Sequence, residues 1–374
     1  MEHSKIALAK RTPGVLALED GRCFPGISVG YEGLSTGEVV FNTSTTGYQG
    51  IITDPSNAGQ IVSMTAPQIG NVGVNPEDSE SALKPPIRGL LMRELSPCVS
   101  NWRATESLDD FLKRHQIVAL SEVDTRSLTQ HLRSHGSKRG IIASGNWNTE
   151  ELIQKAKESL RLEDTDFVDQ LTVSEPVEWS EAGVQPDAAI SNPMCSKKIV
   201  VFDFGVKKSI LRSLVSLGAK IVLVPARTLA DDVLKLQPDG VVLSNGPGDP
   251  ARLGSVAAEV AKLLGEVPIF GIALGHQILG MALGASTYKL KFGHHGGQSV
   301  LDKRTGKVVM TSQNHSFCVK PETLPSEVEV SHVNLHDGSV EGFQHKTLPV
   351  FSVQFHSEDG PRDTADLFEQ FFHF

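Results

Sequence analysis

The chain has 374 residues and a formal net charge of −9, from 35 basic and 44 acidic residues. Its length suggests two or three domains, and its 39% hydrophobic and 21% charged residues are typical of a folded globular protein. No clustered basic face is evident, so we expect no nucleic-acid partner. The four cysteines form no CxxC pair, and no apolar run approaches the ~18 residues that cross a bilayer. We therefore expect a reduced, cytoplasmic protein that does not enter a membrane.

The first part of the chain, to about residue 150, alternates short β-like runs with turn residues such as Asp20-Gly21. These patterns predict a strand-rich α+β domain. Its expected strands are 14–18, 37–41, 60–64 and 140–143, and its expected helices are 107–114 and 125–134, the second capped by Asp124.

A helix is expected at about 149–159, and a polar, proline-containing linker at about 175–197. From Lys198 strands and helices alternate with short loops, which indicates an α/β domain with a mostly parallel sheet covered by helices on both faces. The expected strands are 199–202, 221–224, 240–243 and 268–271, and the helices between them are 207–217, 229–236 and 255–264. We therefore predict domains at 1–150 and 197–374, joined by a helix and linker at 151–196.

Ligands of such sheets bind at the carboxyl ends of the strands. One expected strand is followed there by Asn245-Gly246-Pro247-Gly248. Glycine lets the backbone approach a ligand, and the exposed N–H groups could bind an oxyanion. A tight turn that needs glycine and proline for its geometry alone is an equally good interpretation of this loop.

The next expected strand leads into Gly271-Ile272-Ala273-Leu274-Gly275. Glycines on both sides of a central residue, between a strand and a helix, are typical of a nucleophile elbow. The turn exposes the central side chain, and the following helix directs its amino-terminal amides at developing negative charge. Here the central residue is Ala273, which has no nucleophilic atom, so the pattern alone favours a glycine-rich turn from strand to helix.

Near the end of the chain, His356 and Glu358 are two residues apart. If both follow a strand, the carboxylate can orient the imidazole as a general base, although a surface pair would have the same spacing. His294 and His295 are adjacent in the sequence, and the side chains of adjacent histidines rarely point the same way. Further ligands at a suitable spacing are also lacking, so we predict no metal site. The polar run 313–317 lies in a β-rich stretch, and it could bind a polar ligand or form a turn.

Taken in order, 244–250, 271–277 and the late His-x-Glu resemble a class I, triad-type glutamine amidotransferase domain over about residues 197–374. The first half narrows the resemblance to the small subunit of carbamoyl-phosphate synthetase. The segments that resemble that subfamily are 41–49, 53–56, 68–71, 124–126, 292–297 and 313–315.

This resemblance implies that the subunit hydrolyses L-glutamine and passes ammonia through a tunnel to a large subunit. The large subunit would use bicarbonate and ATP, with magnesium, to make carbamoyl phosphate, and no cofactor is expected on this chain, which has no Walker motif. By the same resemblance, position 273 attacks, His356 is its base and Glu358 orients it. The remaining residues are implied to hold glutamine or its oxyanion: Ser56, Gly246, Gly248, Leu274, Gln277, Asn314, Ser316 and Phe317.

The chain departs from the family at Ala273, where a cysteine nucleophile is expected, and alanine cannot form the thioester. Loss of a covalent nucleophile costs roughly 10⁶ in rate in serine proteases. We expect no rescue by Cys318, which has no reason to occupy the elbow. The chain is therefore expected to be inactive as a glutaminase.

Two explanations of Ala273 remain open. In one, the cysteine of an active subunit has been replaced by engineering. In the other, the chain is a natural pseudo-glutaminase that binds glutamine or acts as a scaffold or regulator. Ser357, where many relatives have proline, and 66–68, where relatives often have Tyr-Pro-His, keep the second explanation open.

Overall fold

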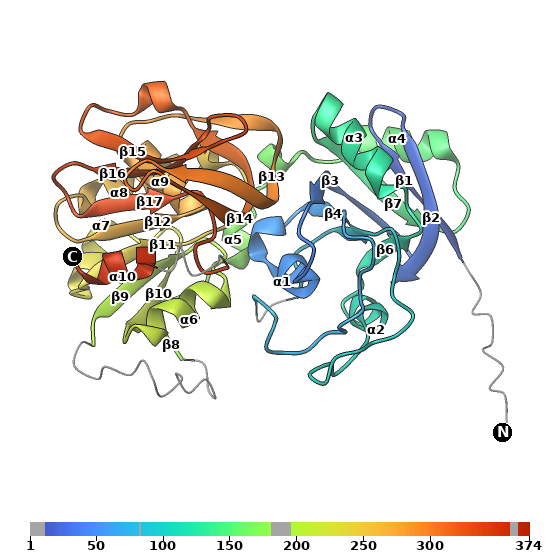
Figure 1. Cartoon of the computed structure of the whole chain (residues 1–374), viewed down its shortest axis with the longest axis horizontal. Coiled ribbons are helices and arrows are strands. Elements are labelled where there is room, and N and C mark those ends of the chain that lie inside the picture. Colours follow the sequence, from blue (N-terminus) through green and yellow to red (C-terminus); the bar gives the residue numbers. More distant parts are fainter. Residues whose placement is uncertain (1–11, 82–83, 181–195, 360–365) are drawn as a thin grey trace. The chain divides into compact units, whose positions relative to one another are not determined.

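The computed structural model describes residues 12–81, 84–180, 196–359 and 366–374. These divide into two compact units (Figure 1). The first comprises Met1–Ile52, Gly59–Ser79 and Lys84–Leu162, and the second comprises Thr53–Ala58, Glu80–Leu83 and Glu163–Phe374. The second unit therefore includes two short stretches from the amino-terminal half of the chain, one of which contains Ser56.

The first unit is a closed barrel with the strand order β1-β2-β6-β5-β4-β3-β7. Its strands are β1 (Pro13–Leu18), β2 (Cys23–Gly30), β3 (Leu34–Asn42), β4 (Gln60–Met64), β5 (Gly89–Leu91), β6 (Val118–Ser121) and β7 (Lys138–Ser144). Its helices are α1 (Tyr48–Thr53), α2 (Leu108–Arg114), α3 (Thr125–His135) and α4 (Thr149–Glu158). The Asp124 side chain accepts a hydrogen bond from the N–H of Ser127, which confirms the expected cap of α3.

The second unit contains a sheet with the strand order β14-β13-β15-β16-β17-β12-β11-β9-β10-β8. Its strands are β8 (Val177–Trp179), β9 (Lys198–Asp203), β10 (Lys220–Pro225), β11 (Gly240–Leu243), β12 (Ile269–Ile272), β13 (Thr287–Asp302), β14 (Lys307–Val319), β15 (Val328–Asn334), β16 (Val340–His345) and β17 (Val350–Val353). Its helices are α5 (Val168–Leu171), α6 (Lys208–Ser216), α7 (Ala230–Lys235), α8 (Gly254–Leu263), α9 (Leu274–Ala282) and α10 (Asp366–Phe372).

The centre of this sheet is parallel, in the order β17-β12-β11-β9-β10, and antiparallel strands extend it on both sides. Helices α6 and α10 bury Leu214 and Phe368 on one face of the parallel strands. Helices α7, α8 and α9 bury Val233, Val260 and Ile278 on the other face. The expected sheet with helices on both faces is therefore present, and it aligns the carboxyl ends of its parallel strands along one edge.

The expected elements of the alternating region all form, and their ends differ from the expected ones by at most one residue. Strand β8 forms inside the expected linker and pairs with β10, and residues 181–195 of that linker lie outside the described residues. The stretch around 313–317 was expected to be β-rich, and it lies in β14, but no strand bounds were predicted between 285 and 355, where β13 to β17 form. Among the described residues, no helix has the length and apolar character to cross a membrane.

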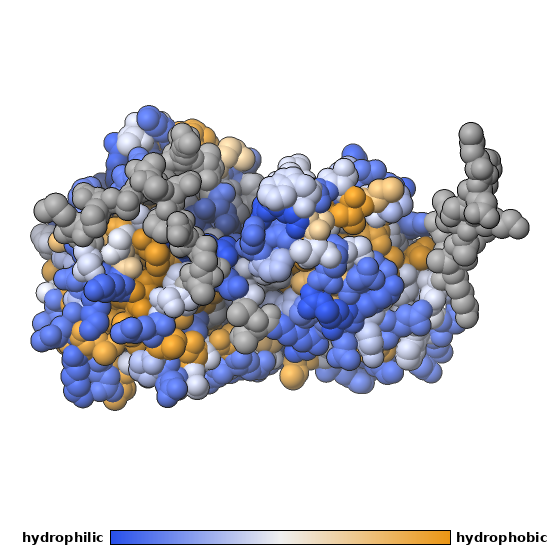
Figure 2. Space-filling model, turned by 90° about the horizontal axis from the view of Figure 1, so that it is seen from below, coloured by the Kyte–Doolittle hydropathy of each residue, from blue (hydrophilic) through white to orange (hydrophobic). Residues whose placement is uncertain are grey.

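A hollow of about 670 Å³ lies against β8, β10 and α6. Figure 2 shows apolar residues gathered on the face of the second unit that faces down in Figure 1. The lining residues Lys198 and Lys220 begin β9 and β10, so the hollow lies at the amino ends of the parallel strands. It is therefore remote from the strand edge where ligands of such sheets bind.

Candidate active site

The expected site residues follow strands that are neighbours in the parallel centre of the sheet. Asn245 follows β11, Ala273 follows β12 and His356 follows β17. Because β11, β12 and β17 pair in parallel register, their carboxyl ends lie side by side. The chain therefore brings these residues to one edge of the sheet.

Ala273 has φ 53° and ψ −107°, a conformation that costs energy in any residue with a Cβ. Its N–H donates to the carbonyl oxygen of Val353 at 3.0 Å, which ties the turn to β17. A Cβ on Gly271 would lie 2.7 Å from the carbonyl oxygen of Gly275, and a Cβ on Gly275 would lie 2.0 Å from that of Leu243. The strained turn and both glycines have the geometry of a nucleophile elbow, although its central residue is alanine.

Helix α9 begins at Leu274, directly after the elbow. The first N–H groups of a helix have no acceptor within that helix, and the helix dipole makes this end partly positive. The N–H of Gly275 donates to the carbonyl oxygen of Ser244 at 2.9 Å and so joins the elbow to the loop after β11. The Leu274 N–H belongs to the first turn of α9, and its role as an oxyanion donor stays a prediction.

The His356 Nδ1 atom lies 2.8 Å from Oε1 of Glu358, and both side chains are buried. The His356 backbone N–H donates to the carbonyl oxygen of Ser312 on β14 at 2.8 Å. The Nε2 atom of His356 is buried and has no hydrogen-bond partner among the described residues. The ring is therefore oriented by a carboxylate at one nitrogen, while the other nitrogen remains available to a reacting group.

Lys207, which the sequence analysis took only as the start of a helix, is a buried cation of this site. Its Nζ atom lies 3.1 Å from Oε1 of Glu358 and also contacts Asp359. Burial would lower the pKa of Lys207, but Asp359 and Glu358 outweigh it and raise that pKa well above its usual value. The only clue in the sequence was its place shortly after a parallel strand, where ligand-facing residues gather.

The charges of Lys207, His356 and Glu358 determine how each of these side chains is protonated. Burial favours the neutral form of Glu358, but Lys207 and His356 outweigh it and lower the pKa of Glu358 to about 2. Burial likewise opposes charge on His356, yet the attraction of Glu358 prevails and raises the pKa of His356. Glu358 is thus a permanent anion at neutral pH that holds the imidazole by charge and by a hydrogen bond.

The loop after β11 contacts the stretch that contains Ser56. The Asn245 Nδ2 atom donates to Oγ of Ser56 at 2.8 Å, and the Ser56 N–H donates to the Asp54 carboxylate at 2.8 Å. A Cβ on Gly246 would lie 2.4 Å from the carbonyl oxygen of Phe204, and Gly248 has φ +94°, so both positions require glycine. Geometry alone accounts for both glycines, and their contact with glutamine stays a prediction.

Gln277, Asn314, Ser316 and Phe317 lie around the start of α9 and along β14. The Gln277 Nε2 atom donates to the carbonyl oxygen of Phe317 at 2.7 Å and to Oε1 of Gln354 at 2.9 Å. The Asn314 Nδ2 atom donates to the Asp54 carboxylate at 2.9 Å. The buried Oγ of Ser316 has no hydrogen-bond partner among the described residues. The Nε2 atom of Gln277 therefore bonds within the chain, whereas Ser316 Oγ retains capacity for a ligand, and the contact of either residue with glutamine stays a prediction.

Asp54, His295 and Gln354 were also missed by the sequence analysis. Asp54 holds both Ser56 and Asn314, and the His295 Nδ1 atom lies 2.8 Å from Oδ1 of Asn314. These partners come from distant parts of the sequence, so no spacing pattern links them. The order of motifs 53–56, 292–297 and 313–315 was the only signal that they belong together.

Within the described residues, two groups could hold a metal ion: His294 with His315 and Glu341, and His356 with Glu358 and Asp359. The second group already surrounds a cation, the Lys207 ammonium. Cys318 is fully buried, and burial raises its pKa well above the usual value, so its thiol is a poor substitute nucleophile.

Comparison with known proteins agrees with this geometry. Residues 16–142 match the family model of the carbamoyl-phosphate synthase small chain, CPSase domain, and residues 200–374 match that of class-I glutamine amidotransferases. Carbamoyl phosphate synthase small chains are 48% identical in Syntrophotalea carbinolica, 49% in Akkermansia muciniphila and 47% in Aquifex aeolicus. These alignments cover 96% of this chain and 96%, 96% and 98% of the respective relatives. The chain belongs to the family of carbamoyl-phosphate synthase small chains and is a glutamine amidotransferase subunit of that enzyme.

Proposed function

We propose that this chain binds L-glutamine at the carboxyl edge of β11, β12 and β17 but does not hydrolyse it as written. The observation that carries the proposal is Ala273 at the centre of an otherwise complete elbow. The base and its orienting carboxylate persist, and the base has a buried, unpartnered Nε2 atom. Because alanine offers neither thiol nor hydroxyl, no acyl-enzyme can form.

In the proposed mechanism of the family reaction, His356 takes the proton of the attacking thiol. The N–H groups of Leu274 and Gly248 then stabilise the oxyanion, and His356 returns the proton to the departing ammonia, which leaves a glutamyl thioester. Water, deprotonated by His356, cleaves the thioester to release glutamate and the thiol. Glutamine would lie against Gly246 and Gly248, and the residues that would hold it are Ser56, Gln277, Asn314, Ser316 and Phe317. In this chain the reaction cannot begin, because Ala273 has no thiol to attack glutamine.

The partner is proposed to be a carbamoyl-phosphate synthase large subunit, because the relatives are small chains of that synthase. ATP and magnesium would then act on that subunit, and this chain would need no cofactor or metal of its own. The negative net charge gives no reason to expect a nucleic-acid partner. A cytoplasmic location fits the unpaired cysteines Cys23, Cys98 and Cys318.

A second candidate is a natural regulatory subunit that binds glutamine and would stay inactive even with a cysteine at position 273, and it is favoured by the same residue. Ala273 does no chemistry, yet it keeps the strained φ of 53° that is costly for alanine. This turn and the intact His356–Glu358 pair together preserve the shape of the pocket. Both functions require glutamine binding.

Calorimetric titration of the unaltered chain with L-glutamine tests the shared requirement. We expect stoichiometric binding with no release of glutamate, and a carbamoyl-phosphate synthase large subunit should co-elute with the chain in size-exclusion chromatography. Absence of glutamine binding, with the large subunit still bound, would leave only a scaffolding role.

A further inference from the structure

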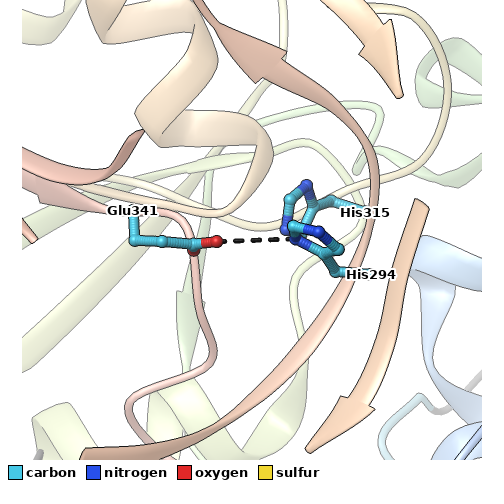
Figure 3. A group of neighbouring side chains, drawn as sticks. All are labelled: His294, His315 and Glu341. Carbon is cyan, nitrogen blue, oxygen red and sulfur yellow. Dashed lines mark ion pairs between the residues drawn. The ribbon is translucent and has the colours of Figure 1, made fainter. Parts of the chain in front are cut away.

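A buried polar cluster lies beside the candidate active site. It contains His294 on β13, His315 on β14 and Glu341 on β16, and Figure 3 shows the Glu341 carboxylate directed at the two imidazole rings. The Glu341 side chain is fully buried. A carboxylate in that position is costly unless charge and hydrogen bonds compensate it, so its contacts indicate what it supports.

Glu341 contacts three other strands or their ends. Its Oε2 atom accepts from Nε2 of Gln313 on β14 at 2.9 Å, and its Oε1 atom accepts from Nδ2 of Asn334 on β15 at 3.1 Å. Oε1 also accepts from Oγ of Ser339 at 3.3 Å and lies 3.5 Å from Nδ1 of His294 on β13. One side chain on β16 therefore joins β13, β14 and β15.

The cluster continues outward through both histidines. The His294 Nε2 atom lies 3.0 Å from the carboxylate of Asp337, which is partly exposed. The His315 Nε2 atom lies 2.9 Å from Oε1 of Gln313, and its Nδ1 donates to the carbonyl oxygen of Phe317 at 2.8 Å. The imidazole of His294 is thus placed between two carboxylates, an arrangement that favours its charged form.

The residues of this cluster are sequence neighbours or hydrogen-bond partners of residues in the candidate glutamine site. His295, which bonds Asn314, follows His294 directly. The Phe317 carbonyl that accepts from His315 also accepts from Gln277. Ser312, which precedes Gln313, accepts the backbone hydrogen bond of His356.

The register of the hairpin makes this position sensitive. The pairing of β13 with β14 shifts between Lys289 and His294 and resumes at His294 opposite His315. Gly293, at the shift, has φ +71° and no room for a Cβ, because one would lie 2.5 Å from Nε2 of His295. The ladder therefore resumes where His294, which lies 3.5 Å from Glu341, is opposite His315.

We propose that Glu341 is a positioning residue that fixes the β13–β14 hairpin so that Asn314, Phe317 and His356 are correctly placed for glutamine. This inference rests on the proposed function, that the site binds glutamine. Glu341 does not touch the substrate in this proposal; it acts through Gln313, His294 and His315.

The test uses equilibrium binding of L-glutamine, which the unaltered chain allows because Ala273 prevents turnover. Glu341→Leu keeps the volume but removes every acceptor, and Glu341→Gln keeps the shape and part of the hydrogen bonding. Hydrogen bonds to a charged group are worth about 1.5–3 kcal/mol, so we expect Glu341→Leu to weaken binding about 10-fold or more. Glu341→Gln should restore binding to within about 3-fold of the parent. The control is Glu329→Gln on β15, whose side chain is exposed, and it should bind as the parent does.

Asp337→Asn is the second variant. The Asp337 side chain is partly exposed, so we expect this variant to fold. It should weaken glutamine binding measurably while the thermal midpoint stays above the assay temperature. In the Ala273→Cys background, the same variants should raise KM for glutamine. A general loss of stability would instead lower the amount of active protein and leave KM largely unchanged.

The outcomes are distinguishable. If the parent does not bind glutamine, the proposed function fails. If the parent binds, and folded Glu341→Leu or Asp337→Asn binds equally tightly, the positioning role is wrong. Metal analysis decides the alternative occupant: stoichiometric zinc that is lost in Glu341→Gln would make the cluster a metal site and overturn the inference.

Discussion

The Nζ atom of Lys207 and the Oε1 atom of Glu358 are 3.1 Å apart, and both side chains are almost fully buried. The same oxygen lies 2.8 Å from Nδ1 of His356. A carboxylate that faces a lysine and a histidine from the interior remains ionised over the whole physiological range. The orienting group of the site is therefore itself held in place by a buried cation.

Replacing Lys207 should destabilise the second unit. Lys207→Met leaves Glu358 and Asp359 without their cation, and breaking a buried pair costs about 3–5 kcal/mol. Urea unfolding at pH 7 measures this change. The control is Lys235→Met, which breaks the exposed pair with Asp232 and should cost less than about 1 kcal/mol. Equal effects of the two variants would contradict the role given to Lys207.

The pH dependence of the restored enzyme should reflect the raised pKa of His356. The base acts as the neutral imidazole, so in Ala273→Cys the acidic limb of kcat/KM should lie above the ordinary 6.5. In Ala273→Cys with Glu358→Gln, burial and Lys207 still oppose the charged ring while the attraction is gone. The limb should therefore move to lower pH as the rate falls. A limb that does not move would show that Glu358 is not the partner of the base.

The elbow glycines should be intolerant of a single methyl group. In Gly275→Ala the new Cβ would lie 2.0 Å from the backbone oxygen of Leu243, which cannot move without disturbing β11. We expect a loss of at least about 1–3 kcal/mol in the free energy of unfolding, together with loss of glutamine binding. Gly254→Ala, with no atom within 4 Å of the new Cβ, is the matched control and should change neither quantity appreciably.

The buried cluster should make stability depend on alkaline pH. Burial opposes charge on His294, but Asp337 and Glu341 outweigh it and raise the pKa of His294 to about 9. A raised pKa contributes stability that is complete below the ordinary 6.5 and is lost as pH rises through about 9. The free energy of unfolding should fall across this window, by up to about 3 kcal/mol. Asp337→Asn should flatten the fall, and equal slopes in both proteins would contradict this assignment.

The sequence predicted the parts of the fold that local patterns encode. Alternating strands and helices predicted the parallel strands and the edge that they share, and the spacing of Gly271 and Gly275 predicted a turn with no room for bulk, which the structure confirms. The spacing of His356 and Glu358 likewise predicted a hydrogen bond between them. These features depend on residues that are close in the sequence.

The rest depends on residues that are distant in the sequence. Lys207 meets Glu358, Asp54 meets Asn314, and Glu341 meets Gln313, and none of these pairs has a spacing that a pattern could reveal. The bounds of the polar strands β13 and β14 could not be predicted, because their hydrophobic alternation is interrupted by glycine and histidine. Long-range partners of buried charges therefore required the three-dimensional structure.

The measurement that tests the account most directly is glutamate release by the unaltered chain and by Ala273→Cys, each with and without a carbamoyl-phosphate synthase large subunit. The account predicts release by Ala273→Cys alone, faster when the large subunit is present. If Ala273→Cys binds glutamine but releases no glutamate, the pocket has lost more than its nucleophile, and glutamine binding without turnover would replace hydrolysis as the function of this site.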